Sequence, residues 1–324
     1  MARLCTRSAL HMNHYSYEAY GLRVCSAIEI PELPPATHAA DASEVDIGGG
    51  DVPTRLEPVD YEQHDATSQG ENYLIISEGR VLLNVDGVGR YLVEGGTKVT
   101  IDPEPGASEH EIRVFLLGTC VGAILHQRGA FVLHASGIGT EQGAVLFAGR
   151  SGAGKSTLLA EFLERGYRML VDDVCAVRLE SNQLIVAPSY PRTRVWSDTA
   201  AEFQIDTTGL QPTLSDMAKF ERQLPDQFWP TPLKPRAVFE LIGPSADGMT
   251  FTPLSPMEAL PRLISHTYRK MMLDALGIRR HHFDLASAVA STVPIFRVTR
   301  PQHGFSVAAI ADRIVTDLEL APPS

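Results

Sequence analysis

A glycine-rich segment between two regular elements constrains the fold of this chain more than any other feature. The apolar run GAVLFAG leads into G-R-S-G-A-G-K-S, which ends at Ser156, and a helical pattern follows from Lys155 to about Arg165. The next apolar run, YRMLV, ends at the adjacent residues Asp172 and Asp173. Strand, glycine loop, helix and strand in this order predict an α/β fold.

The glycine segment fits the pattern G-x-x-x-x-G-K-[ST], whose residue types suit the binding of phosphate. Glycines let successive backbone N–H groups turn toward phosphate oxygens, and the N-terminus of the following helix adds a partial positive charge. Lys155 would reach the β- and γ-phosphates of ATP, and the Ser156 hydroxyl would hold Mg²⁺. The flanking strand and helix make a chance glycine turn the less favoured interpretation. The predicted nucleotide-binding residues are Gly149, Arg150, Ser151, Gly152, Ala153, Gly154, Lys155, Ser156 and Thr157.

Two carboxylates follow the strand after the glycine loop. At the carboxyl end of a parallel strand, Asp172 and Asp173 would lie beside the loop. One of them can assist Mg²⁺, while the other accepts the proton of an attacking hydroxyl group. The alternative is one metal-associated aspartate beside one solvated turn residue.

The histidines and cysteines on their own say little about the function. His134 lies in the apolar run FVLHASGI, and a single histidine in an apolar strand is more often structural than catalytic. The side chains of His281 and His282 would diverge on a helix or a strand, so we expect no metal site there. The four cysteines are widely spaced and lack a C-x-x-C pair, which favours reduced, structural thiols.

The first 110 residues are expected to form a small β-rich domain. Residues 72–104 comprise four β-prone runs separated by glycine turns, which predicts an antiparallel meander. Residues 32–65 are rich in Pro, Ala, Asp and Gly and are expected to form a flexible linker.

Residues 111–324 are expected to form the second, catalytic domain. It would begin with a helix over 111–127, where apolar residues recur at helical spacing. Its C-terminal part predicts strands at 237–242 and 294–300, a helix over 256–268 that Pro261 breaks or offsets, and a last helix over 305–318.

Composition excludes some functions. The chain of 324 residues has 28 basic and 39 acidic side chains, a formal charge of −11, which argues against general nucleic-acid binding. No apolar run approaches the roughly 20 residues that cross a bilayer, and the start lacks the apolar core of a signal peptide. We therefore expect a cytoplasmic protein without membrane or nucleic-acid partners.

The segment LHASGIGTEQGAVLFAGRSGAGKSTLLAEFLERGYRMLVDDVCAV resembles the catalytic core of HPr kinase/phosphorylase. In that family a strand histidine, a phosphate loop, a helix ending in Arg-Gly and a strand ending in Asp-Asp occur in the same order and spacing. Phosphoenolpyruvate carboxykinase shares the underlying phosphate-loop architecture. The resemblance implies that Asp172 is the catalytic base, that Asp173 assists the metal, and that Lys155 and His134 belong to the active site.

The rest of the chain departs from HPr kinases. The family's Glu-Arg-Gly-Leu-Gly stretch, associated with phosphorolysis, is not found after Asp173, and the N-terminal meander is unlike the family's usual first domain. The segment P-L-K-P-R at 232–236 resembles its mobile basic loop. Together these features resemble the HPr-kinase-related proteins of bacterial peptide natural-product clusters, notably the lasso-peptide kinases, which phosphorylate the C-terminal serine of a precursor peptide.

The resemblance implies an ATP-dependent serine kinase whose acceptor is a peptide or small protein. Charge on the transferred phosphoryl group calls for a second cation besides Lys155. The candidates are Arg192, Arg194, Lys234 and Arg236, and each of them could equally be a solvated surface charge. Two further interpretations remain open: a kinase of an HPr-type carrier or of free serine, and a nucleotide-hydrolysing switch. HPr kinases are hexamers, so a homo-oligomer is compatible with the resemblance.

Overall fold

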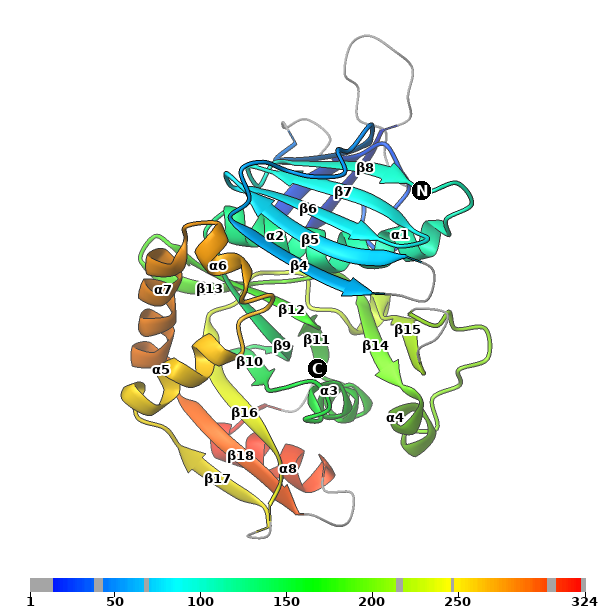
Figure 1. Cartoon of the computed structure of the whole chain (residues 1–324). Helices are drawn as coiled ribbons and strands as arrows, with labels where there is room; N and C mark the ends of the chain where they lie inside the picture. Colours follow the sequence, from blue (N-terminus) through cyan, green and yellow to red (C-terminus); the bar gives the residue numbers. More distant parts are fainter. Residues whose placement is uncertain are drawn as a thin grey trace. The chain divides into compact units, whose positions relative to one another are not determined.

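The computed structural model describes residues 14–37, 43–66, 70–213, 218–245, 248–301 and 307–321. By their internal contacts the residues group into two compact units. Unit 1 comprises Met1–Ala130 and Arg269–His282, and unit 2 comprises Phe131–Tyr268 and Phe283–Ser324. The chain is a mixed α/β protein in which each unit contains a large sheet (Figure 1).

Unit 1 contains an eight-stranded sheet in the order β1-β2-β3-β8-β7-β6-β5-β4. Strands β5 to β8 pair antiparallel in sequence order, which confirms the predicted meander. β3 lies parallel to both β2 and β8 and so joins the first hairpin to the meander. The strands are β1 (Tyr15–Ala19), β2 (Leu22–Ser26), β3 (Val45–Gly49), β4 (Tyr61–Ala66), β5 (Glu71–Ser77), β6 (Arg80–Val85), β7 (Gly89–Glu94) and β8 (Lys98–Pro103).

The segment expected to be a flexible linker is largely part of this sheet. β3 lies inside the sheet, with the alternate residues Val45 and Ile47 buried, and β4 forms its edge. Val52 and Leu56, between those strands, are buried in one apolar cluster with Leu82. The prolines and glycines of 32–65 indicated a loop, but the apolar residues among them are enough to fix the chain on the sheet. Residues 38–42 lie outside the described part of this segment.

The helical segment predicted over 111–127 is present, with a π-helical turn in its middle. It consists of α1 (Glu109–Phe115), η1 (Leu116–Cys120) and α2 (Val121–Gln127). The Gln127 side chain accepts a hydrogen bond from the Gly96 N–H and donates to the Gly79 carbonyl, which fixes the helix end to two turns of the meander. This segment therefore groups with unit 1, whereas the sequence placed it at the start of the second domain after residue 110.

The buried His282 of unit 1 makes a pH-dependent contribution to stability. The rings of His126 and His282 lie 6.4 Å apart, and burial, with His126, His281 and Lys270 nearby, lowers the pKa of His282 to about 4. Because the folded-state pKa lies below the unfolded value, this contribution is complete above about pH 6.5 and is lost as the pH falls toward 4. Urea unfolding of wild type and His282→Gln at several pH values should therefore show a steeper acid loss in wild type. Parallel pH profiles would contradict this expectation.

Unit 2 contains a sheet in the order β13-β12-β9-β10-β16-β18-β17, with β11 also paired to β9. β10, β16 and β18 are parallel neighbours, whereas β9 runs antiparallel to β10. A separate two-stranded sheet pairs β14 with β15. The strands are β9 (Phe131–Thr140), β10 (Gly143–Ala148), β11 (Arg168–Val171), β12 (Val174–Glu180), β13 (Gln183–Ala187), β14 (Arg192–Trp196), β15 (Lys219–Gln223), β16 (Pro235–Ser245), β17 (Thr250–Pro253) and β18 (Ile295–Pro301).

Helices cover both faces of this sheet, so unit 2 has three layers. Along β10, Leu146 belongs to the apolar cluster under α5 and α7, while its neighbours Val145 and Phe147 belong to the cluster under α3 and α8. This alternation buries both faces, as expected of a strand inside an α/β sheet. The helices are α3 (Lys155–Glu164), α4 (Ser197–Glu202), η2 (Pro225–Gln227), α5 (Pro256–Ser265), α7 (Arg279–Thr292) and α8 (Val307–Leu318). The first residues of α7, up to His282, group with unit 1, as does α6 (Met272–Ala275).

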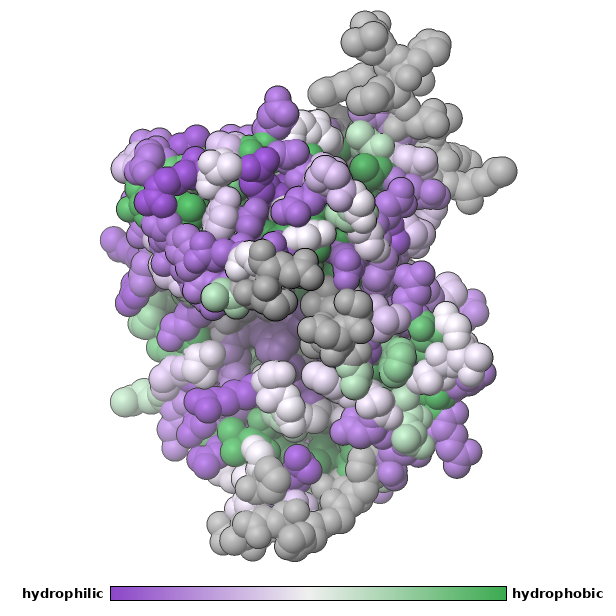
Figure 2. Space-filling model, turned by 45° about the vertical axis from the view of Figure 1, so that its right-hand side comes forward, coloured by the Kyte–Doolittle hydropathy of each residue, from purple (hydrophilic) through white to green (hydrophobic). Residues whose placement is uncertain are grey.

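The predicted C-terminal elements correspond to β16, α5, β18 and α8. Pro261 lies within α5 without ending it, and α5 begins with a capping box between Ser255 and Glu258. Phe305, predicted to lie on the last helix, falls outside the described residues. Among the described residues, no helix is both long and apolar enough to cross a membrane. Hydrophilic residues cover most of the coloured surface in Figure 2, with hydrophobic residues in small groups between them.

Candidate functional site

The glycine loop begins where β10 ends, and its backbone conformation requires glycine. Gly149, Gly152 and Gly154 all have positive φ angles, and α3 starts directly after Gly154. A Cβ atom on Gly149 would lie 2.7 Å from the Leu241 carbonyl oxygen of β16, which excludes a larger residue there. The loop is therefore held between two parallel strands and the N-terminus of a helix, the arrangement that suits an anion.

Lys155, the first residue of α3, turns back onto the loop. Its Nζ atom donates hydrogen bonds to the carbonyl oxygens of Gly149, at 2.8 Å, and of Arg150, at 3.1 Å. The side chain is buried, and this burial lowers its pKa to about 8 despite the nearby carboxylates of Asp173 and Asp172. Among the described residues no carboxylate forms an ion pair with this ammonium group, so a buried positive charge faces the loop where an anionic ligand would bind.

Asp172 and Asp173 occupy a break between β11 and β12. Both strands pair with the same edge of β9, so that Val171 stands opposite Gly137 and Val174 stands opposite His134. Asp173 adopts a left-handed conformation with φ of 68° at the break. Breaks of this kind in a strand re-aim side chains and are frequent beside active sites.

The register of β9 also explains why the aspartates lie near the loop. On its other edge β9 pairs with β10, and Ala148, the last residue of β10, stands opposite Ala135. Both β10 and β11 run antiparallel to β9, so their carboxyl ends meet at the same level of the sheet. We expected parallel neighbouring strands here, but the antiparallel strand β9 between β10 and β11 brings the aspartates equally near the loop.

The Asp172 carboxylate is 9% exposed and accepts three hydrogen bonds. Ser136 Oγ donates to Oδ1 at 2.7 Å, while Thr193 Oγ1 and the Arg194 backbone N–H donate to Oδ2 at 2.8 Å and 3.0 Å. An ionised carboxylate has about four lone-pair positions, so one position on Oδ1 stays available. Asp172 is thus fixed in orientation and keeps one site that can accept a proton.

Asp173 is held by two cationic or potentially cationic groups. His134 Nδ1 lies 3.1 Å from Asp173 Oδ1, and an Arg194 nitrogen lies 3.1 Å from Oδ2. Burial would raise the pKa of Asp173, but the hydrogen bond from His134 and the charge of Arg194 outweigh it and lower that pKa. Asp173 therefore remains ionised, which suits a metal ligand better than a general base.

These groups line one cavity of about 330 Å³ together with the loop. The glycine loop, the break in β11–β12, strand β9 and the β14–β15 sheet each contribute to its wall. Two carboxylates and the Ser156 hydroxyl supply the oxygen ligands that Mg²⁺ prefers, so the residues present fit this ion. The predicted site residues with charged, imidazole or hydroxyl side chains that line it include His134, Lys155, Ser156, Asp172, Asp173 and Arg194.

The other predicted cations do not lie at this cavity. Arg192 is buried, forms an ion pair with Glu221 and does not line the cavity. Lys234 and Arg236 lie at the amino end of β16, where its neighbour Pro235 pairs with Ala144 at the start of β10. Because the loop follows the other end of β10, about 13 Å along the strand, these two side chains are not brought to it.

The sequence motifs do not include several residues that lie at the site. Ser136 follows His134 at the spacing of two that places both side chains on one face of a strand, which was a usable signal. Thr193 and Lys219 come from β14 and β15, whose pairing brings them to the site without any motif. Arg300, at the end of β18, lines two cavities next to the loop.

The described elements thus define a mixed α/β protein with a strand, a glycine loop and a helix beside two carboxylates. No protein-family model matches the chain, and no curated protein matches it. Among solved structures it is similar to an HPr(Ser) kinase/phosphatase from Coxiella burnetii, with 14% sequence identity and a TM-score of 0.31. The similarity covers 58% of this chain and 95% of that one. Overlap this low leaves the function to be inferred from the site itself.

Proposed function

We propose that this chain is an ATP-dependent kinase that transfers the γ-phosphoryl group to a serine hydroxyl of a peptide or small protein. The observation that carries the proposal is the meeting of the glycine loop, Lys155 and two differently held carboxylates in one cavity. A loop of this kind serves nucleotide binding in general, whereas a free carboxylate position next to it serves an acceptor hydroxyl.

In the proposed reaction Asp172 is the base. The acceptor oxygen forms a bond to the γ-phosphorus while the bond to the β,γ-bridging oxygen breaks, and the hydroxyl proton passes to Asp172 Oδ1. ADP is the leaving group. Lys155 stabilises the charge that develops on the phosphate oxygens. Mg²⁺ on Ser156 and Asp173 would neutralise part of the phosphate charge.

The β14–β15 sheet contributes two cations to the wall of the cavity. Arg194 is bound to Asp173, while the Lys219 ammonium stands 5.3 Å from the centre of the Trp196 ring. All three residues line the cavity, so they support a role for this sheet in holding the acceptor or the transferred group. The nearby aromatic residues Phe228 and Trp229 do not line this cavity and pack against the apolar clusters of unit 2.

The acceptor class rests on the sequence resemblance to lasso-peptide kinases, and we propose the C-terminal serine of a precursor peptide. Purified protein with Mg²⁺ and γ-labelled ATP should label such a peptide on its last serine, and the label should be lost from a peptide ending in alanine. Label on an HPr-type protein or on free serine alone would replace the peptide with that acceptor. Release of free phosphate without any labelled acceptor would contradict a kinase and favour a nucleotide-hydrolysing switch.

The lowered pKa of Lys155 predicts that nucleotide binding takes up a proton near pH 8. Phosphate oxygens beside Nζ favour the charged form and raise its pKa, so the affinity should fall as the pH rises above about 8. Calorimetry in two buffers of different ionisation enthalpy should show proton uptake at pH 8 and almost none at pH 6.5. Lys155→Arg, which stays charged throughout, is the matched control and should take up no proton. Equal uptake by both proteins would contradict the assignment to Lys155.

A further inference from the structure

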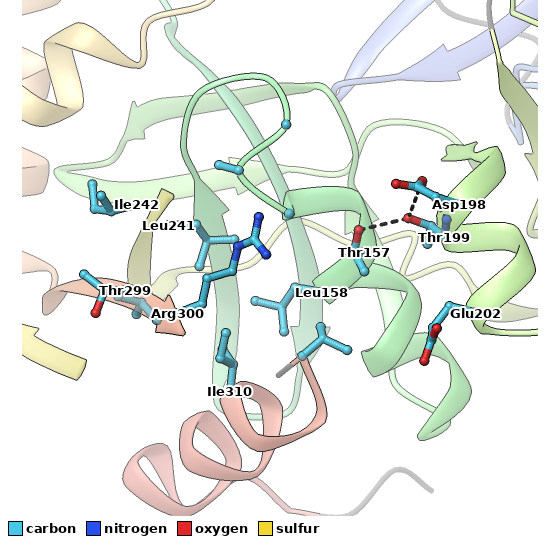
Figure 3. Close-up of a pocket in the computed structure, with 15 residues that line it drawn as sticks. Thr157, Leu158, Asp198, Thr199, Glu202, Leu241, Ile242, Thr299, Arg300 and Ile310 are labelled. Atoms are coloured by element: carbon cyan, nitrogen blue, oxygen red, sulfur yellow. Dashed lines mark hydrogen bonds between the residues drawn. The ribbon is translucent and has the colours of Figure 1, made fainter. Parts of the chain in front are cut away.

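A second cavity of about 300 Å³ adjoins the other side of the glycine loop. Gly152, Gly154 and Thr157 line both this cavity and the one that holds the aspartates, so the two meet at the loop. Aliphatic walls of the second cavity come from α3, β16, β18 and α8, while α4 adds the polar side chains of Asp198, Thr199 and Glu202 (Figure 3). The aliphatic side chains that form these walls are Leu158, Leu241, Ile242, Val298, Val307 and Ile310.

One cationic side chain enters this apolar space. Figure 3 shows Arg300 extending from the end of β18 into the cavity, with Leu158 and Leu241 among the labelled side chains around it. The Nε atom of Arg300 is buried and has no hydrogen-bond partner among the described residues. A buried, unpaired donor is unfavourable in the free protein and is a place where a ligand with an acceptor group or a π face gains affinity.

The direction of a bound nucleotide follows from what each cavity contains. Lys155, Ser156 and both aspartates belong to the first cavity, which fixes the position of the transferred phosphate. The rest of the nucleotide must then extend along the loop to its other side, past Thr157. Small-molecule sites are mostly apolar with a few placed polar groups, and the second cavity has this character.

We propose that the second cavity binds the purine base of the nucleotide, with the guanidinium group of Arg300 against the base. The proposal rests on the kinase function proposed above, and it adds the orientation of the nucleotide and a residue that no sequence pattern indicated. A planar guanidinium stacks on an aromatic ring while aliphatic side chains cover the ring's other face and edges. Recognition of the base then depends on β18 and α8, whereas recognition of the phosphates depends on the loop.

The test compares a ligand that has a base with one that has none. Calorimetry would measure the affinities of Mg-ATP and Mg-tripolyphosphate for wild type, Arg300→Ala and Lys155→Ala. We expect Arg300→Ala to weaken ATP about tenfold or more and tripolyphosphate less than twofold, because only ATP has a base. Lys155→Ala should weaken both ligands. Arg297→Ala is the matched control, since Arg297 lies three residues earlier on β18 and does not line the cavity.

A second variant keeps the test independent of the folding of Arg300→Ala. Ile310→Trp should fill the cavity from α8 and weaken ATP while leaving tripolyphosphate binding unchanged. If Arg300→Ala weakened both ligands equally, Arg300 would contact phosphate and the proposal would be wrong. Unchanged ATP binding in both variants would also overturn it. Wild type that binds neither ligand would overturn the kinase function itself, and a preference for CTP over ATP and GTP would overturn the assignment to purines.

Discussion

Asp172→Asn is expected to lower the rate of phosphoryl transfer about 10³-fold while changing the affinity for ATP less than twofold. The variant loses the proton acceptor but keeps the shape of the side chain. Its amide oxygen can still accept from Thr193 and the Arg194 N–H, and the Ser136 hydroxyl can turn to accept from the new amide group. Single-turnover kinetics and calorimetric titration separate the two effects.

Asp173→Asn is the matched comparison. It removes the negative charge that His134 and Arg194 hold and the proposed metal ligand, so it should weaken the dependence of ATP binding on Mg²⁺ as well as slow transfer. If Asp172→Asn transferred phosphate at the wild-type rate, Asp172 would not be the base. A loss of Mg²⁺-dependent binding in Asp172→Asn instead of Asp173→Asn would exchange the two roles.

Lys155→Ala is expected to weaken ATP binding at least tenfold and to slow transfer by a further 10²- to 10³-fold, values that are typical for the loss of a charged donor at a phosphoryl group. The variant also removes the hydrogen bonds that Nζ donates to the Gly149 and Arg150 carbonyl oxygens. Thermal unfolding should therefore be measured alongside binding, to show that the weaker ATP binding does not result from a loss of folded protein.

The conservative variant distinguishes charge from geometry at this position. Lys155→Arg keeps the charge, but its planar, larger head group cannot occupy the same buried position, so we expect it to bind ATP and to transfer phosphate slowly. Transfer at the wild-type rate by Lys155→Ala would contradict the assignment of the glycine loop as the phosphate site.

Much of the catalytic unit could be predicted because local patterns determine it. The apolar run before Gly149, the glycines at positive φ and the helix from Lys155 follow from rules that act over a few residues. The meander of unit 1 could be predicted for the same reason, since each of its turns carries a glycine between β-prone runs.

What the sequence missed depends on pairing between distant segments. β3 lies parallel to β2 and β8, and nothing within 45–49 indicates either partner. The Asp172 carboxylate is fixed by Ser136 and Thr193, which stand 36 and 21 residues away in the chain. Lys234 and Arg236 were chosen for their charge, but the register of β16 places them at the far end of the sheet.

The long-range hydrogen bonds of Asp172 also connect two separate sheets of unit 2. Its carboxylate connects β9, through Ser136, with β14, through Thr193 and Arg194, so it acts as a joint between the main sheet and the β14–β15 sheet. A carboxylate that has taken up a proton accepts hydrogen bonds more weakly. If Asp172 takes up the proton as proposed, each turnover would weaken this connection between the two sheets at the moment when the product leaves the cavity.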